Sequence, residues 1–467
     1  MGRRTAWWRV AVVGAVLGAV AGAPGTPGFA ASVSPTTVTS PSASASPSSS
    51  TSASPSSSPS SSATASSYAF AEDAPSVTGA TDTADAERLE PGTTYRSSLP
   101  SDGKIYYRLV LDGSSTVYVA ATAVPPTDAA VTPTEGVRVS VQDADGRSCS
   151  AADTASIGAG RSPRPLTVWA ARQLPSNRSL CRGAGTYYVV VERVLRTESA
   201  PGDWDLELAP VSEPRLRKAA STTSAPEAWD SATPSPPGGE GERRRGGGGF
   251  GSATALKQGV WRDEVRPGQT LFYEVPVDWG QQVYATADLS SASGGGAGGF
   301  VPGGVNLALY NPVRGLVDDT SISYNGSRKS GALAAVPPVG YDNRYAVSDR
   351  VGGMRFAGSY YLVVHLAERV GEEFGDGPFG LTLRVEVTGT ATAGPGYAGQ
   401  SEPSGIFQVG LLGRGSGAAE DAGASDGDGG GGAGMKLVAA GGIGAGTLVL
   451  VVLGVWVVVG RRRAAGA

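Results

Sequence analysis

The chain has 467 residues, enough for two or three domains, and its 69 glycines and 32 prolines indicate long linkers between them. Its 38 basic and 42 acidic residues nearly balance, which argues against nucleic acid as a partner, because no basic excess is available to neutralise phosphates. Two cysteines and one histidine are too few for a typical structural metal site, and we expect neither a metal nor another cofactor.

Residues 1–30 have the parts of a secretory signal peptide: an arginine-containing start, an apolar stretch of small residues, and a small-residue cleavage site. We expect cleavage after Ala30, with Ala31 as the alternative. The pair Arg3 and Arg4 leaves a twin-arginine export signal open, and an uncleaved anchor is the third interpretation. An exported protein meets oxidising surroundings, which bears on its cysteines.

Residues 31–84 are a Ser/Pro/Thr-rich tract with almost no large apolar side chains, so we expect them to stay disordered. Residues 85–212 then show several short apolar runs separated by turn signals, the pattern of a β-sandwich. The expected strands are residues 94–99, 104–111, 116–122, 137–141, 166–170, 185–191 and 204–208.

Cys149 and Cys181 both fall within this first sandwich. In an oxidising compartment a disulfide between them is the default expectation, and two buried free thiols are the alternative. Closing a loop of this length stabilises a fold by about 3–4 kcal/mol in the chain-entropy model.

Residues 213–254 read as a linker, because they combine a proline-rich stretch, an arginine run and four consecutive glycines. Residues 255–389 then repeat the pattern of the first sandwich. Six segments match in type and order, which predicts a duplication and a second β-sandwich. The matched pairs are residues 89–92 with 256–259, 105–111 with 271–277, 117–120 with 283–286, 137–141 with 305–309, 185–191 with 358–364 and 204–208 with 379–383.

The fifth pair is the most specific, because each copy has a glycine, a small hydroxyl residue, two tyrosines and an apolar run. Successive side chains of a strand point to opposite faces. In the second copy Tyr360 therefore shares a face with Leu362, while Tyr361 shares the other face with His365. The polar residues mark the second face as the solvent face, so we expect Tyr187 and Tyr360 in the cores. Tyr188 and Tyr361 are then the candidate ligand contacts.

Residues 390–435 form a Gly/Ala/Asp spacer, and residues 436–460 are apolar over a length that can cross a bilayer. Arg461, Arg462 and Arg463 follow at once in the tail, residues 461–467. By the positive-inside rule they act as a stop-transfer signal and stay in the cytoplasm. We therefore expect a single-pass type I protein of the cell membrane whose bulk is extracellular.

Two details of this end of the chain bear on partners. The sortase cleavage motif Leu-Pro-x-Thr-Gly is absent, so we expect the membrane helix to be retained. Gly442 and Gly446 have the spacing that lets two membrane helices approach closely, which leaves a homodimer open on weak grounds.

The two copies together resemble a known family, the bacterial pre-peptidase C-terminal domain, a small β-sandwich found on secreted peptidases. The residues that carry the resemblance are a strand with paired aromatics, a Val-x-Val strand ending in Asp-x-x-Gly, and the Ala-Gly-Thr-Tyr-Tyr-Val-Val-Val stretch. They lie at residues 104–111, 137–146 and 184–191. The family's usual Asp-Leu-x-Leu strand is absent. Some relatives bind calcium near acidic loop residues, and this sequence departs from them there, so the calcium site is not carried over. The resemblance implies an accessory or binding module with no catalytic residues of its own.

Catalytic patterns in the chain lack their structural context. Residues 423–427 match the G-x-S-x-G pattern around Ser425, but they lie in the spacer without the flanking strand and helix that the pattern needs. His365 is expected at the surface of a strand with no nucleophile near it. Asp143 and Asp145 are followed by Gly146 and lack the later ligands of an EF-hand, so we expect a hairpin turn; Asp318 and Asp319 are equally weak candidates.

These observations favour an all-β, non-enzymatic envelope protein that presents two tandem β-sandwich binding modules, with disordered linkers and one C-terminal transmembrane helix. Its partner would be an envelope protein or a glycan. One alternative is an accessory subunit of an envelope or secretion complex docked through the membrane helix. The other, far less favoured, is a cryptic hydrolase that uses Ser425 and His365.

Overall fold

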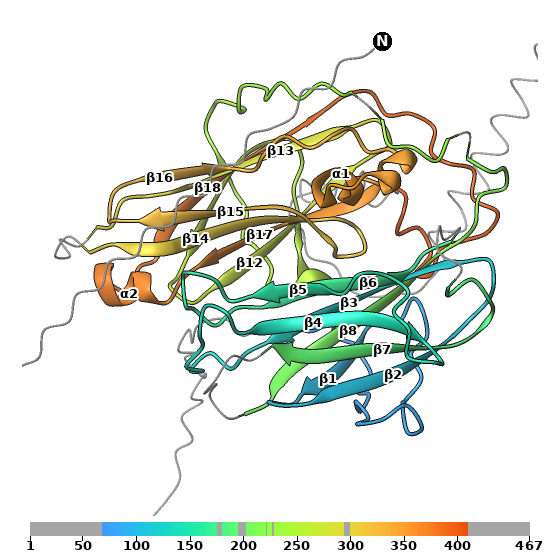
Figure 1. The fold of residues 1–467 in the computed structure, drawn as a ribbon. Coiled ribbons are helices and arrows are strands. Elements are labelled where there is room, and N and C mark those ends of the chain that lie inside the picture. Colours follow the sequence, from blue (N-terminus) through green and yellow to red (C-terminus); the bar gives the residue numbers. More distant parts are fainter. Residues whose placement is uncertain are drawn as a thin grey trace, which may run out of the picture. The chain divides into compact units, whose positions relative to one another are not determined.

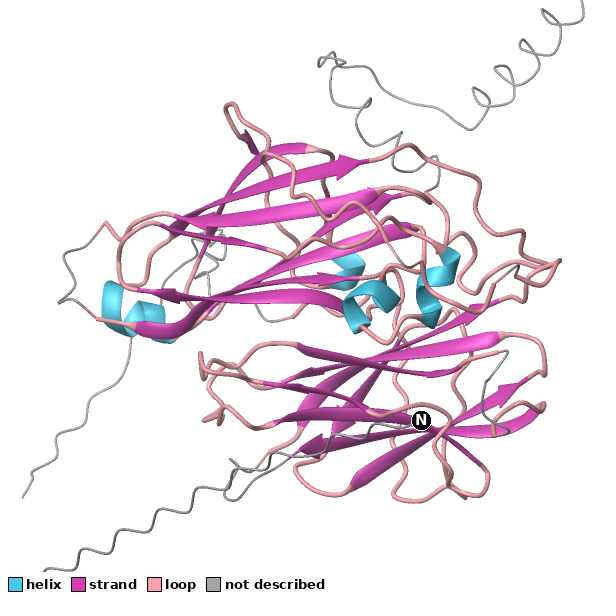
Figure 2. Cartoon of the chain, turned by 45° about the horizontal axis from the view of Figure 1, so that its top comes forward, coloured by secondary structure: helices cyan, strands magenta, loops and turns pink. Residues whose placement is uncertain are grey.

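The computed structural model describes residues 68–174, 180–194, 202–220, 222–226, 228–293 and 299–409. This part of the chain lies within one compact unit and is all-β, with two β-sandwiches of two sheets each, as predicted (Figure 1). Its helices are short: η1 (Phe250–Ser252), η2 (Tyr341–Tyr345), α1 (Asp349–Gly353) and α2 (Arg369–Phe374) (Figure 2). None of the helices in the described ranges is long and apolar enough to cross a bilayer.

The first sandwich is built from eight strands: β1 (Tyr95–Leu99), β2 (Lys104–Leu111), β3 (Thr116–Val124), β4 (Gly136–Asp143), β5 (Asp153–Ser156), β6 (Leu166–Arg172), β7 (Gly185–Val194) and β8 (Trp204–Glu213). One sheet has the order β1-β8-β3-β6 and the other β2-β7-β4-β5. We call them the β8 sheet and the β7 sheet after a central strand of each.

The second sandwich contains β9 (Glu242–Arg243), β10 (Thr254–Ala255), β11 (Gly259–Val265), β12 (Thr270–Val277), β13 (Gln282–Leu289), β14 (Val301–Tyr310), β15 (Leu316–Tyr324), β16 (Lys329–Ala332), β17 (Gly358–Leu366) and β18 (Phe379–Thr388). Its β18 sheet has the order β16-β13-β18-β11-β9, and its β17 sheet has the order β10-β12-β17-β14-β15.

The two sandwiches have the same topology. The order β1-β8-β3-β6 corresponds to β11-β18-β13-β16, and β2-β7-β4-β5 corresponds to β12-β17-β14-β15. The second sandwich adds only the two-residue strands β9 and β10 at its edges, both paired in parallel. The predicted internal repeat is therefore confirmed at the level of strand order.

Each core lies between the two sheets of its sandwich and is lined by alternate residues of the strands. In the first sandwich Val189 and Val191 of β7 are fully buried, and in the second Leu362 and Val364 of β17 are fully buried. The predicted core face of the motif strands is thus confirmed, because burial of every second residue on a strand selects one face.

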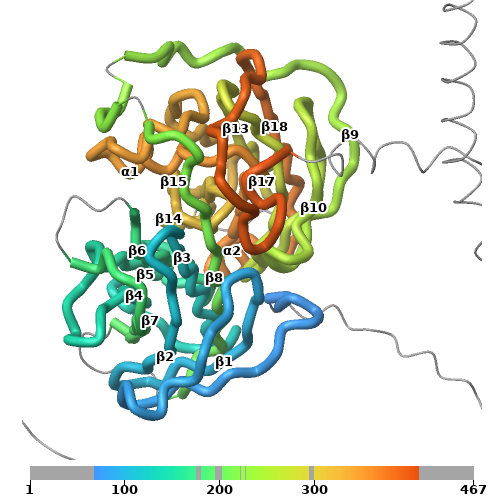
Figure 3. Tube along the Cα trace, turned by 90° about the vertical axis from the view of Figure 1, so that its right-hand side faces the viewer, coloured from blue at the N-terminus to red at the C-terminus, as the bar shows by residue number. Residues whose placement is uncertain are grey.

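Two segments outside the predicted sandwich boundaries also pack on the sheets. Residues 68–88, the N-terminal strap, run along the edges of β1 and β2, where the backbone N–H groups of Val77 and Ala80 donate to the carbonyls of Arg96 and Tyr106 (Figure 3). Residues 389–409, the C-terminal strap, form antiparallel bridges to the end of β8 and to the chain just after it, between Glu402 and Ser212 and between Tyr397 and Leu216. Covering an edge satisfies backbone groups that would otherwise face solvent.

The segment that the sequence assigned to a linker, residues 213–254, also contacts the second sandwich over part of its length. We call residues 228–245 the middle strap. The side chains of Gln282 and Arg384 donate to the carbonyls of Asp230 and Pro237, and Tyr284 donates to Ala232. These contacts use the strap's backbone carbonyls, so a composition poor in apolar residues can still hold a segment against a sheet.

Candidate binding surfaces

The motif strands β7 and β17 begin at equivalent glycines with positive φ, 154° at Gly185 and 137° at Gly358. A Cβ added at Gly358 would lie 2.3 Å from the carbonyl oxygen of Ile406, so a side chain has no room there. The first tyrosine of each motif is buried, and its hydroxyl donates to a carbonyl four residues upstream, Gly183 for Tyr187 and Phe356 for Tyr360. These tyrosines specify the fold, as predicted.

The second tyrosines lie on equivalent outer faces in different surroundings. Tyr361 contacts the ring of Phe250 edge-on, with the ring centroids 5.0 Å apart, and burial raises its pKa. Tyr188 is half-buried between its cross-strand neighbours Arg108 and Gln142 on the outer face of the β7 sheet. Of the two predicted ligand contacts, Tyr188 therefore lies on an open face and Tyr361 under another segment.

The outer face of the β17 sheet is covered by the outer face of the β8 sheet. Glu207 of β8 is fully buried at this junction and accepts hydrogen bonds from the Tyr68 hydroxyl at 2.8 Å and the Ala71 amide at 3.0 Å. Arg314, from the turn between β14 and β15, pairs with the same carboxylate at 2.5 Å. Arg314 of the other sandwich thus neutralises the charge of Glu207, and donors of the N-terminal strap supply hydrogen bonds to its oxygens. A buried carboxylate requires both.

A second buried glutamate of β8 repeats this arrangement. Glu213 accepts hydrogen bonds from Tyr118 of β3 and Tyr397 of the C-terminal strap, both at 2.8 Å. Arg344 of η2 pairs with it at 2.7 Å. Two ion pairs between the sandwiches, each completed by a strap, make their relative position specific, because each arginine has only one matching carboxylate.

Apolar contacts surround these ion pairs. Phe356 lies edge-on to Tyr118, with centroids 5.2 Å apart, and stacks on Phe407 of the C-terminal strap at 4.9 Å. Near Glu207, Phe250 and Tyr68 both pack edge-on against Phe272 of β12. No signal in the sequence marked Glu207 or Glu213, because their arginine partners lie more than a hundred residues away.

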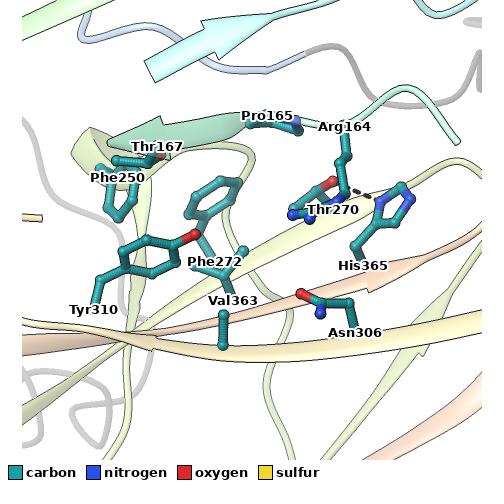
Figure 4. Close-up of a pocket in the computed structure, with 11 residues that line it drawn as sticks. Arg164, Pro165, Thr167, Phe250, Thr270, Phe272, Asn306, Tyr310, Val363 and His365 are labelled. Atoms are coloured by element: carbon teal, nitrogen blue, oxygen red, sulfur yellow. Dashed lines mark hydrogen bonds between the residues drawn. The ribbon is translucent and has the colours of Figure 1, made fainter. Parts of the chain in front are cut away.

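The prediction that His365 lies at the surface is wrong. The residue is 4% exposed and lines a small cavity with Arg164 of the first sandwich (Figure 4). Its Nδ1 shares a hydrogen bond of 3.0 Å with the Thr270 hydroxyl, and its Nε2 has no partner within the described ranges. Burial, with a smaller contribution from the charge of Arg164, lowers the pKa of His365 to about 3. The cause of the error is tertiary: the face that alternation assigned to solvent is the face that the first sandwich covers.

An open cleft lies beside the covered face. It has a volume of about 950 Å³ and is lined by both sandwiches, by the middle strap and by the C-terminal strap. Tyr361 and its cross-strand neighbour Glu274 line it on the β17 sheet. Arg244 also lines it, with its guanidinium 5.7 Å from the centre of the ring of Trp261, another lining residue. Aromatic rings beside charged and backbone groups can hold a ligand by stacking and hydrogen bonding together.

Other predicted features are placed as follows. Cys149 and Cys181 form the predicted disulfide, which has no counterpart in the second sandwich. Asp143 caps its own turn, accepting from the backbone amides of Asp145 and Arg147. Asp318 pairs with Arg350 at 2.7 Å. Within the described ranges no group of three or more histidine, cysteine or acidic side chains is placed to hold a metal ion.

Several predictions fall outside the described residues. They are the signal peptide at residues 1–30, most of the disordered tract, the G-x-S-x-G pattern at Ser425, the transmembrane helix at residues 436–460, its glycines Gly442 and Gly446, and the stop-transfer residues Arg461, Arg462 and Arg463.

No protein-family model matches the chain, and no curated protein matches its sequence. Among solved structures, the CUB1-EGF-CUB2 domains of human MASP-1/3 are 9% identical, with a TM-score of 0.16, covering 63% of this chain and 99% of that one. The tandem CBM22 domain of a Paenibacillus barcinonensis protein is 11% identical, with a TM-score of 0.16, covering 65% and 93%. Tandem CBM51 modules of a Streptococcus pneumoniae family 98 glycoside hydrolase are 10% identical, with a TM-score of 0.16, covering 64% and 84%. Each of these is similar to the chain in being an arrangement of tandem domains, and at such scores the matches carry no argument about ligand or activity.

Proposed function

We propose that the chain is a non-enzymatic envelope protein that presents its two β-sandwiches outside the membrane as one binding unit. The observation that carries this proposal is the cleft of about 950 Å³, whose walls come from both sandwiches and two straps. Its size is at the upper end of ligand pockets, which suits a ligand of several units, a peptide or an oligosaccharide. A wall shared between sandwiches exists only when the Glu207 and Glu213 ion pairs hold them together.

The location is part of the same proposal. A signal peptide at residues 1–30 exports the chain, and the helix at residues 436–460 with Arg461, Arg462 and Arg463 retains it as a single-pass type I membrane protein. Kinship of both sandwiches with the pre-peptidase C-terminal domain also belongs here. It would make the protein an accessory or binding module, consistent with a cleft lined by aromatic and backbone groups.

The test fills the cleft without touching either core. Ser359 lines the cleft on β17, and Ser359→Trp would place an indole there. Thr382→Trp is the matched control, because Thr382 is also a half-buried strand residue and lies on the β18 sheet away from the cleft. Full-length protein in detergent is passed over immobilised peptides and purified envelope polysaccharides.

We expect the wild-type protein and Thr382→Trp to be retained by the same probe, and Ser359→Trp to lose retention by about tenfold or more. Equal retention of all three proteins would show that the cleft is not the binding site. Turnover of any probe by the wild-type protein would contradict the non-enzymatic assignment.

A further inference from the structure

The outer face of the β7 sheet is the counterpart of the covered β17 face, and on its edge strand β2 the side chains of Arg108 and Val110 are exposed. Its rows run across three strands, so that Arg108, Tyr188 and Gln142 are direct neighbours, as are Tyr106, Val190 and Ser140. We call these six residues together with Val110 the open face. Val110 is 48% exposed, Tyr106 and Tyr188 are half-buried, and Val190 and Ser140 are buried. Within the described ranges neither tyrosine makes a ring contact or a hydrogen bond through its side chain.

The outer face of the β17 sheet has equivalent residues, and these residues pack against other parts of the protein. Phe272 corresponds to Tyr106, Tyr361 to Tyr188 and Val363 to Val190. All three belong to an apolar cluster that also contains Tyr68 of the N-terminal strap and Phe250. The covered face is therefore in contact with protein, and rings pack edge-on across it.

The charges of the open face differ from those of the covered one. Arg108 is exposed and makes no ion pair within the described ranges, whereas its counterpart is Glu274. At the end of the same face Lys104 and Arg138 share Glu192, each at 3.3 Å. Together with these neighbours the outer side of the β7 sheet carries three cations and one carboxylate, and Arg108 is the cation that has no ion-pair partner among the described residues. Tyrosine and arginine are the residues most often found at the energetic centres of protein interfaces.

A second copy of this chain is a poor occupant. The surface that covers the β17 face uses Glu207 and Glu213 of β8, and the matched positions of β18 are Thr382 and Thr388. The middle strap also lies over the outer face of the β18 sheet, through Tyr284 and Arg384. The complementary carboxylates are therefore missing from the face that a second copy would offer.

We infer that the open face is a docking surface for a different protein, one that presents a carboxylate to Arg108 and apolar side chains to Tyr106, Tyr188 and Val110. This inference rests on the proposal that the chain is a binding protein, but it does not depend on the cleft. Apolar contact of the two tyrosines with the partner protein supplies affinity. The ion pair between Arg108 and the partner's carboxylate supplies orientation and choice of partner.

The test places the photo-crosslinking residue p-benzoylphenylalanine at position 188 of the full chain in intact cells. The matched control has the same residue at position 284, because Tyr284 is also half-buried on an outer sheet face but lies under the middle strap. The replacement keeps an aromatic ring at both positions, so the fold is retained. We expect a discrete protein adduct from position 188 and none from position 284. Arg108→Glu should lower the yield about tenfold, and Arg108→Lys should preserve most of it.

Mass spectrometry of the adduct identifies its site, which should lie beside Asp or Glu of the captured protein. Ser359→Trp should leave the adduct unchanged, so that failure of the cleft and failure of the open face can be told apart. Four outcomes overturn the inference: an adduct with a second copy of this chain, an adduct insensitive to Arg108→Glu, equal adducts from both positions, or an adduct that consists of acidic polysaccharide instead of protein.

Discussion

The outer faces of the β7 and β17 sheets have the same strand order, and the chain uses them in different ways. On the β17 sheet Phe272, Tyr361 and Val363 lie beneath the first sandwich and the residues that seal the junction. On the β7 sheet the counterparts Tyr106, Tyr188 and Val190 form an open face flanked by Arg108. The comparison teaches that duplication reproduced the cores, while a few outward-facing residues decided which sheet became an internal junction.

Breaking the cover of the β17 sheet should have the largest effect. Glu207→Ala would leave Arg314 buried and unneutralised, which costs about 3–5 kcal/mol of unfolding free energy. Glu192→Ala on the β7 sheet is the control, because Glu192 is partly exposed and its loss should cost about 1 kcal/mol or less. Chemical denaturation of both variants measures the difference, and similar costs would show that the junction is not held by this carboxylate.

Replacing the second tyrosine of each motif by alanine gives a matched pair of variants whose expected effects on stability are of intermediate size. Tyr361→Ala would remove a ring that packs on Phe250, and we expect a loss of about 2 kcal/mol in unfolding free energy. Tyr188→Ala removes a half-buried ring that makes no ring contact and no side-chain hydrogen bond within the described ranges, so its cost should stay below about 1 kcal/mol. Thermal and denaturant unfolding of the two variants provide the test. If Tyr188→Ala proves the more costly, the open face is covered in solution.

Lowering the pH should weaken the packing on the covered β17 face, because His365 lies there. The equivalent residue of the β7 sheet is Glu192. The pKa of His365 is about 3 when folded and about 6.5 when unfolded, so between these values only the unfolded chain binds the proton. The contribution of uncharged His365 to the free energy of unfolding is complete above pH 6.5. It is lost progressively as the pH falls toward 3, and the loss is about 2 kcal/mol at pH 5.

Arg164, Thr270, Asn306 and Tyr310 line the cavity with His365, and no carboxylate lines it; the carboxylate of Asp319 accepts a hydrogen bond from Asn306 outside the lining. His365→Gln should remove this part of the pH dependence, which unfolding curves at pH 7.5 and pH 5 measure. His365 is the only histidine in the chain, so the remaining slope in this range comes from carboxylates. An unchanged slope in the variant would mean that the ring is protonated without cost and is therefore not enclosed.

Much of the fold was predictable because it depends on local patterns. Alternation along β7 and β17 identified Tyr187 and Tyr360 as core residues, and the repeated motif identified the duplication. The straps were missed for a related reason. Residues 68–88 and 228–245 look disordered or linker-like by composition, yet they are held through backbone hydrogen bonds, which composition does not report.

The candidate site was only half predictable. The sequence indicated Tyr188 and Tyr361 as outward-facing, and both lie on outer faces. It could not indicate that one borders a cleft shared with the first sandwich, nor that Glu207 and Glu213 are buried. A glutamate on a strand reads as a solvent residue until its partner is known, and these partners come from the other copy.

By itself, then, the amino-acid sequence determined most of the strands, the duplication, the core face of each motif strand and the pairing of Cys149 with Cys181, while β5, β11, β15 and β16 were not predicted. The predicted features follow from the period of two along a strand and from the chemistry of two cysteines in an oxidising compartment. Only the tertiary structure decided which outer face is covered, because that choice depends on contacts such as Glu207 with Arg314, which are 107 residues apart in the chain. A period of two distinguishes one face of a strand from the other, but it carries no information about what will lie against either face.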